Sequence, residues 1–119
     1  MNRTSTTEEG LLENLIAKAV ELHADSLEVE YKDGREEVCA MRGCVGGGIA
    51  SLDSLSSEVK AFRQRIRKIG KKGLNVTVDG KTHRLTVAAY DSFGEEAYRI
   101  EIGSPNKASQ PIAAKRGSG

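Results

Sequence analysis

The sequence predicts an α+β fold in which two helices pack on one face of a mostly antiparallel sheet of about five strands, in the order αββαβββ. Two segments repeat apolar residues at three- and four-residue steps, as amphipathic helices do. The segments after them alternate apolar and polar residues around two Asp-Gly pairs, a composition typical of tight hairpins. Because the strands come in groups and do not alternate singly with helices, an antiparallel sheet is favoured over a parallel one.

The composition fits one soluble domain. Of the 119 residues, 38% are hydrophobic and 29% are charged, which is too apolar for a disordered protein and too charged for a membrane span. We expect a single domain over residues 7–102, between a disordered N-terminus (1–6) and a disordered tail (103–119). The formal net charge of +1 gives no overall field that would attract an acidic partner.

The first helix is predicted over residues 7–23, where Thr6 and Glu9 have the spacing of a capping box. Its apolar stripe comprises Leu12, Leu15, Ile16, Ala19 and Val20. A hairpin follows, with strands over residues 26–31 and 36–41 and a two-residue loop at Asp33-Gly34. This loop places Val29 opposite Val38 and Leu27 opposite Ala40, so that apolar side chains share one face.

Glycines then interrupt the strand pattern, and we expect an irregular loop over residues 43–48 with a short extended piece at 48–51. The glycine spacing is that of a phosphate-binding loop, but Ile49 and Ala50 stand where Lys and Ser or Thr would contact phosphate and magnesium. The backbone N–H groups of Gly46, Gly47 and Gly48 stay a candidate anion site, and the alternative is a connector or a bulge.

The second helix is predicted from Ser54 to about Ile69, capped by Asp53 or Ser54 and ended by Gly70 or Gly73. Its apolar stripe comprises Leu55, Val59, Phe62, Ile66 and Ile69. A second hairpin around Asp79-Gly80 places His83 opposite Val76, and a last strand is expected over residues 97–102. We expect one core, made of Leu12, Leu15, Ile16, Leu27, Val29, Val38, Val59, Phe62, Ile66, Leu85, Val87 and Ile100.

The second helix also has a distinctive charge pattern. A basic surface lies opposite its apolar stripe and continues past its end; it consists of Lys60, Arg63, Arg65, Arg67, Lys68, Lys71 and Lys72. It could be a solvated face paired with acids of the first helix, such as Glu8, Glu9, Glu13 and Glu21. It could also orient an acidic protein partner or contact nucleic-acid phosphates. The chain has no Trp, two Phe and three scattered Tyr, which disfavours stacking on bases.

No arrangement of residues predicts catalysis. No Ser, Cys or acidic pair stands in a nucleophile motif, so we expect neither an enzyme nor a cofactor. The soft metal ligands lack the spacing of a zinc site, and we expect no metal at His23, Cys39, Cys44 and His83. Two cysteines and a polar start without a leader favour free thiols in the cytoplasm.

Three short motifs are similar to those of a known family. Residues 24–29 read Ala-Asp-Ser-Leu-Glu-Val and precede the Asp33-Gly34 turn, residues 84–88 read Arg-Leu-Thr-Val-Ala, and residues 94–100 read Gly-Glu-Glu-Ala-Tyr-Arg-Ile. Over residues 11–102 the chain thereby resembles the domain that precedes the motor core in type II secretion and type IV pilus ATPases. That family's first motif reads Ala-Ser-Asp-(Ile/Leu)-His-(Ile/Leu), so Ser26 and Glu28 stand here in place of Asp and His.

The resemblance implies a stand-alone interaction domain, because in that family this domain packs against neighbouring subunits of a ring and couples the motor to other parts of the machine. No nucleotide-binding core with its phosphate-loop lysine follows in the sequence, so we expect no ATP hydrolysis by this chain. We expect a small non-enzymatic protein-interaction module, a partner or regulator of such an assembly, which binds a protein and could form homo-oligomers. The alternative is a nucleic-acid or nucleotide-phosphate binder that uses the basic second helix.

Overall fold

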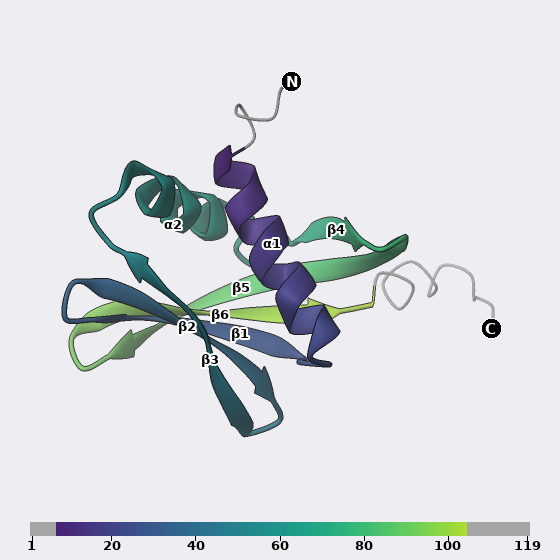
Figure 1. The fold of residues 1–119 in the computed structure, drawn as a ribbon, viewed down its shortest axis with the longest axis horizontal. Helices are drawn as coiled ribbons and strands as arrows, with labels where there is room; N and C mark the ends of the chain where they lie inside the picture. The colour runs from purple at the N-terminus through teal and green to yellow at the C-terminus, as the bar shows by residue number, and fades with distance from the viewer. Residues whose placement is uncertain (1–6, 105–119) are drawn as a thin grey trace.

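Within residues 7–104, which the computed structural model describes, six antiparallel strands form one sheet with two helices on one face (Figure 1). The elements are α1 (Thr7–Glu21), β1 (Ser26–Lys32), β2 (Arg35–Arg42), β3 (Val45–Asp53), α2 (Ser57–Ile69), β4 (Leu74–Val78), β5 (Lys81–Ser92) and β6 (Glu95–Gly103). The sheet order β3-β2-β1-β6-β5-β4 sets two αβββ units side by side. The predicted α+β class is confirmed, with one strand more than expected.

The two Asp-Gly hairpins have the predicted registers. Val29 pairs with Val38 and Leu27 with Ala40 across the first turn, and Val76 pairs with His83 across the second. Asp33 and Asp79 have φ values of 51° and 50°, a left-handed conformation that Asp tolerates better than most residues. The turn residues therefore fix which side chains face the helices.

The additional strand is β3, which replaces the predicted glycine loop. Only Gly43-Cys44 form the turn, and Gly43 has a φ of 65°, as the first position of a two-residue hairpin loop requires. A Cβ at position 46 would overlap the Met41 Sδ and the Ala40 carbonyl oxygen, so this position in the strand needs glycine. The candidate anion loop at Gly46, Gly47 and Gly48 is thus wrong as a loop, because these residues pair with β2 in an extended edge strand.

Helix α2 begins at Ser57, later than the predicted Ser54. Its N-cap is Ser56, whose hydroxyl accepts a hydrogen bond from the Val59 N–H at 3.1 Å. Leu55 was expected in the apolar stripe, but it precedes the helix and is 78% exposed. The helix ends as predicted at Gly70, whose φ is 46°.

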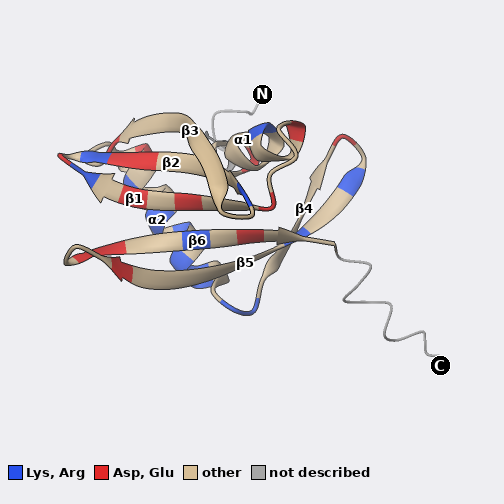
Figure 2. Ribbon diagram, turned by 90° about the horizontal axis from the view of Figure 1, so that it is seen from below, with Lys and Arg blue, Asp and Glu red and all other residues tan. Residues whose placement is uncertain are grey.

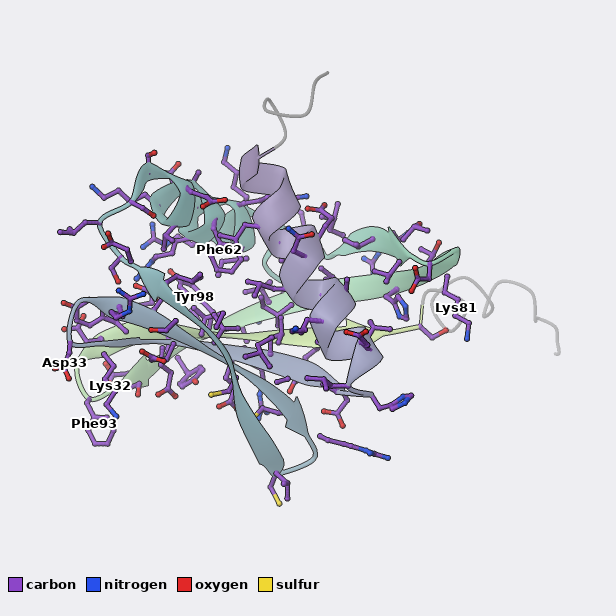
Figure 3. The ribbon with its side chains drawn as sticks, in the orientation of Figure 1. Lys32, Asp33, Phe62, Lys81, Phe93 and Tyr98 are labelled. Atoms are coloured by element: carbon purple, nitrogen blue, oxygen red, sulfur yellow. The ribbon has the colours of Figure 1, made fainter. Side chains whose placement is uncertain are left out.

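The core lies between the helices and the sheet. All twelve residues predicted for it are buried. Eleven of them belong to one hydrophobic cluster, and Val59 is buried outside it. Phe62 of α2 and Tyr98 of β6 lie between helix and sheet (Figure 3).

The predicted flanking segments fall mostly beyond the described part of the chain. Residues 1–6, with the Thr6 of the capping box, and residues 105–119 lie outside it, whereas Gly103 is the last residue of β6. Neither helix of the described part is long and apolar enough to cross a membrane.

Candidate interaction surface

The basic surface predicted on α2 is divided between two flanks of the helix. Arg65 faces α1, where its guanidinium donates to both carboxylate oxygens of Glu13 at 3.1 and 3.0 Å. Arg63 and Arg67 face the sheet and bond to acids of β2 and β6. All three arginines of the predicted surface therefore make ion pairs within the chain.

Arg63 forms the most buried of these pairs. Its Nη1 lies 2.8 Å from Oε2 of Glu36, a carboxylate of which only 1% is exposed. The Ser54 hydroxyl donates to the same oxygen at 2.9 Å, whereas the buried Oε1 has no hydrogen-bond partner. Burial opposes the charge of Arg63, but the field of Glu36 and the hydrogen bonds to Tyr98 and Glu36 outweigh it and raise the pKa of the guanidinium.

A second, more exposed group surrounds Tyr98. Arg67 Nε donates to the Tyr98 hydroxyl at 2.7 Å, and that hydroxyl donates to Oε1 of Glu96 at 2.6 Å. Arg67 Nη2 lies 3.1 Å and Arg63 Nη2 3.8 Å from the same carboxylate oxygen. The hydrogen bonds from Tyr98 and Arg67 lower the pKa of Glu96.

Arg63 adds a contact between the two hairpins in the region where their strands no longer pair. Pairing between β1 and β6 covers residues 26–29 and 98–101 only, so the β1–β2 and β5–β6 hairpins extend beyond it without pairing to each other. Arg63 binds Glu36 of the first hairpin and Glu96 of the second. Its guanidinium also lies over the Tyr98 ring, 5.5 Å from the centroid.

Four lysines remain of the predicted basic surface. They are exposed and pair with no acid among residues 10–104: Lys60, Lys68, Lys71 and Lys72. Figure 2 shows the blue Lys and Arg segments of α2 behind the sheet, and red acidic segments on β1 and β2 in front. The surface available to a partner is therefore smaller than the sequence pattern indicates.

The tips of the two linked hairpins project from one end of the molecule (Figures 1 and 3). The tip of the second is Phe93-Gly94, and both residues have positive φ, 52° and 84°. The Phe93 side chain is fully exposed, with a relative accessibility of 102%. It points away from the body of the protein (Figure 3).

Two further exposed apolar side chains lie at this end. Tyr31, in the first hairpin, is 38% exposed. Leu55 follows Ser54, whose N–H donates to the Gly34 carbonyl oxygen in the tip of that hairpin at 3.2 Å. We call Tyr31, Leu55 and Phe93 the end surface.

A groove lies behind the end surface, between the C-terminal half of α2 and the β5–β6 hairpin. Its volume is about 250 Å³, and its walls are Ile66, Arg67, Gly70, Val87, Ala89, Glu96 and Tyr98. The Val87 N–H donates to the Gly70 carbonyl oxygen at 2.9 Å and so ties the end of α2 to β5. Ala89 is exposed although its partner Tyr98 is buried, because the helix covers only part of β5.

The open face of the sheet carries a row of acids. Glu30 and Glu37 face each other across β1 and β2, and their charges are partnered from the sides by the hydroxyls of Tyr90 (2.9 Å) and Ser51 (2.8 Å). Cys39 lies on the same face, and burial raises the pKa of its thiol, together with the nearby carboxylates of Glu28, Glu30 and Glu37.

The candidate metal ligands are spread over the fold. His23 follows α1, Cys39 is in β2, Cys44 is in the β2–β3 turn and His83 is in β5. Both cysteines are free thiols, and among the described residues no group of three His, Cys, Asp or Glu could hold a metal ion. The two histidines line an open cleft of about 780 Å³ at the opposite end of the sheet, beside Asp25 and Lys81.

Phe93 and Glu36 are two of the residues of this site that were not predicted from the sequence. Phe93 occupies the position before glycine that Asp33 and Asp79 occupy in the other hairpins, so the alignment of these turns could have identified it. Glu36 lies on the same face of β2 as Val38 and Ala40, which the predicted register already implied.

No protein-family model matches the chain, and a search of curated proteins finds no match either, so the resemblance to secretion and pilus ATPases stays a prediction.

Proposed function

We propose that the chain is a small protein-interaction module without catalytic activity, which binds a protein partner through the end surface. The observation that carries this proposal is the conformation and exposure of Phe93. A non-glycine residue in the left-handed region costs about 1–2 kcal/mol, and Asn, Asp and Gly are the residues that tolerate it. Phe93 gains no burial within the chain to offset that cost.

Aromatic anchors are typical of protein interfaces. Phe and Tyr are enriched at interface centres because a rigid ring buries a large apolar area and loses little side-chain entropy. Phe93 and Tyr31 stand on two hairpins that Arg63 holds in a fixed relation. The polar network next to them consists of structural ion pairs, which supports a binding function over a catalytic one.

The test places a photoreactive phenylalanine analogue at position 93 in the native host. Irradiation is expected to give a discrete protein adduct at this position. The matched control is position 45, because Val45 is also exposed (71%) and follows the β2–β3 turn at the opposite end of the sheet. Equal adducts at both positions, or none at position 93, would contradict the proposal.

The identity of the adduct also tests the finer part of the proposal. On the motif resemblance alone, we look for the partner in a secretion or pilus ATPase assembly, and on the cysteine usage we look for it in the cytoplasm. An adduct with an unrelated protein would contradict the proposed link to such an assembly and would still support binding through the end surface.

A second candidate function rests on the four exposed lysines of α2 and the segment after it. If they bind nucleic acid, the affinity for duplex DNA should fall with salt at a log-log slope of about −0.9 per phosphate contacted. Charge reversal at Lys68 and Lys72 should then abolish binding. We expect only the weak non-specific affinity of about 100 μM or worse at physiological salt, because the arginines already pair within the chain.

A further inference from the structure

We infer that the groove between α2 and the β5–β6 hairpin receives Phe93 of a second copy of this chain, so that two copies exchange Phe93 side chains across a two-fold axis. This inference rests on the proposed function, since it names the partner of the same surface. Three observations support it: the size of the groove, the distance by which the hairpin extends beyond the helices, and the charges of the hairpin tip and the groove.

The groove suits an aromatic ring. Its volume of about 250 Å³ exceeds what one phenyl side chain needs, and Ile66, Val87 and Ala89 give it an apolar floor. It opens at Ala89, where the helix layer ends and the inner face of the hairpin is uncovered. A ring placed there would cover exposed Ala89 and pack beside Ile66 and Val87, which are already buried in the core.

The hairpin reaches beyond the helix layer by a suitable length. Phe93 is four residues past Ala89, which corresponds to roughly 13 Å of extended strand. The ring therefore cannot fold back into the groove of its own copy, because the strand between them is held straight by pairing with β6. A second hairpin laid antiparallel on the uncovered inner face would bring its own tip to that groove.

The charges of tip and groove are complementary. Residues 91–96 carry Asp91, Glu95 and Glu96 and no base. Arg67 of the helix wall is already paired with Glu96, so the base free to attract the tip is Lys71, which is exposed, follows Gly70 at the end of the groove and pairs with no acid among residues 10–104. An acidic tip would be repelled by an anionic membrane surface, whereas it is attracted to the unpaired charge of Lys71 beside the groove.

The arrangement favours a closed dimer over a chain of copies. The hairpin that carries the tip also forms one wall of the groove, so one two-fold axis lets each copy insert its Phe93 and receive the other at once. Burial of two rings per dimer predicts that losing both weakens dimerisation at least about 100-fold.

The test is sedimentation velocity over a range of protein concentrations. We expect wild type to reach twice the 12.8 kDa mass of one chain and to dissociate as salt rises from about 50 to about 500 mM. Phe93→Asp removes the aromatic ring from the tip and places there the residue that Asp33 and Asp79 provide in two other hairpins, so we expect the fold to be retained. Ala89→Trp fills the groove from an exposed position, and Val45→Asp is the control that should dimerise like wild type.

Mixing the variants tests the exchange itself. Phe93→Asp and Ala89→Trp alone should be monomeric, whereas an equimolar mixture regains one of the two contacts and should associate more than either. A monomeric wild type at about 1 mM, or a Phe93→Asp variant that still dimerises, would overturn the inference. If wild type is monomeric and position 93 crosslinks to a different protein, the proposed function stands and only the exchange fails.

Discussion

Removal of Arg63 tests whether the buried Glu36 carboxylate depends on it. Glu36 is 1% exposed and its Oε2 has two partners, Arg63 at 2.8 Å and Ser54 at 2.9 Å. Without Arg63, the buried Glu36 carboxylate keeps only the hydrogen bond from the Ser54 hydroxyl. Loss of one partner from a buried pair costs about 3–5 kcal/mol of unfolding free energy. Because the Arg63 side chain is itself 21% exposed, water can replace part of it, and we expect the lower end, about 3 kcal/mol, for Arg63→Ala.

The assay is urea unfolding followed by circular dichroism, with an unchanged m-value as evidence that the compared states are the same. Arg67→Ala is the matched control, since Arg67 is on the same helix, binds Glu96 and is 50% exposed; it should cost less than about 1 kcal/mol. The double variant Glu36→Leu/Arg63→Met should lie close to wild type, because it removes the buried charge together with its partner. Equal costs for Arg63→Ala and Arg67→Ala would refute the reasoning.

Three further outcomes are expected. Phe62→Ala should lower the unfolding free energy by about 3–5 kcal/mol in the same urea assay, because the ring is completely buried; a loss under about 1 kcal/mol would show that it is not part of the core. Glu96→Gln should flatten the pH dependence of the melting temperature, because the pKa of this carboxyl is lower in the folded than in the unfolded protein. The ionised carboxylate stabilises the fold above the unfolded pKa of about 4.3, and this stabilisation is lost as the pH falls through the pKa of the folded state. Thiol reagents near pH 8 should label Cys44 before Cys39, because Cys44 is exposed while burial and nearby carboxylates raise the pKa of Cys39; equal rates in the two single Cys→Ser variants would contradict this.

The fold could be predicted wherever local chemistry fixes the backbone. The Asp-Gly turns determined both registers, because a shift by one residue would have moved every apolar side chain to solvent. Strand β3 could not be predicted in this way, since its glycines have low strand propensity and no side chains to reveal an alternation. Only the pairing with β2 shows that Gly46 is required for the close approach of Met41.

The candidate site was less predictable, because the sequence does not show which neighbouring residues a charged side chain contacts in the fold. The basic residues of α2 looked like one surface, yet Arg63, Arg65 and Arg67 point to three different acids. Two of these acids, Glu36 and Glu96, come from strands far along the chain in either direction. Phe93 was overlooked for the opposite reason, since a single aromatic residue in a turn has no periodicity to mark it.

The central pairing of β1 with β6 determines the order in which the protein can complete its sheet during synthesis. Residues 26–29 bind residues 98–101, so the edge of β1 finds its partner only after roughly 70 more residues have been added, about 4–14 s at usual translation rates. Until then the first αβββ unit exposes an unpaired strand containing Leu27 and Val29. A nascent chain stalled before β6 would contain β1–β3 and β4–β5 without the β1–β6 pairing that joins the two halves of the sheet. We expect the nascent chain to be most prone to aggregation before β6 is synthesised.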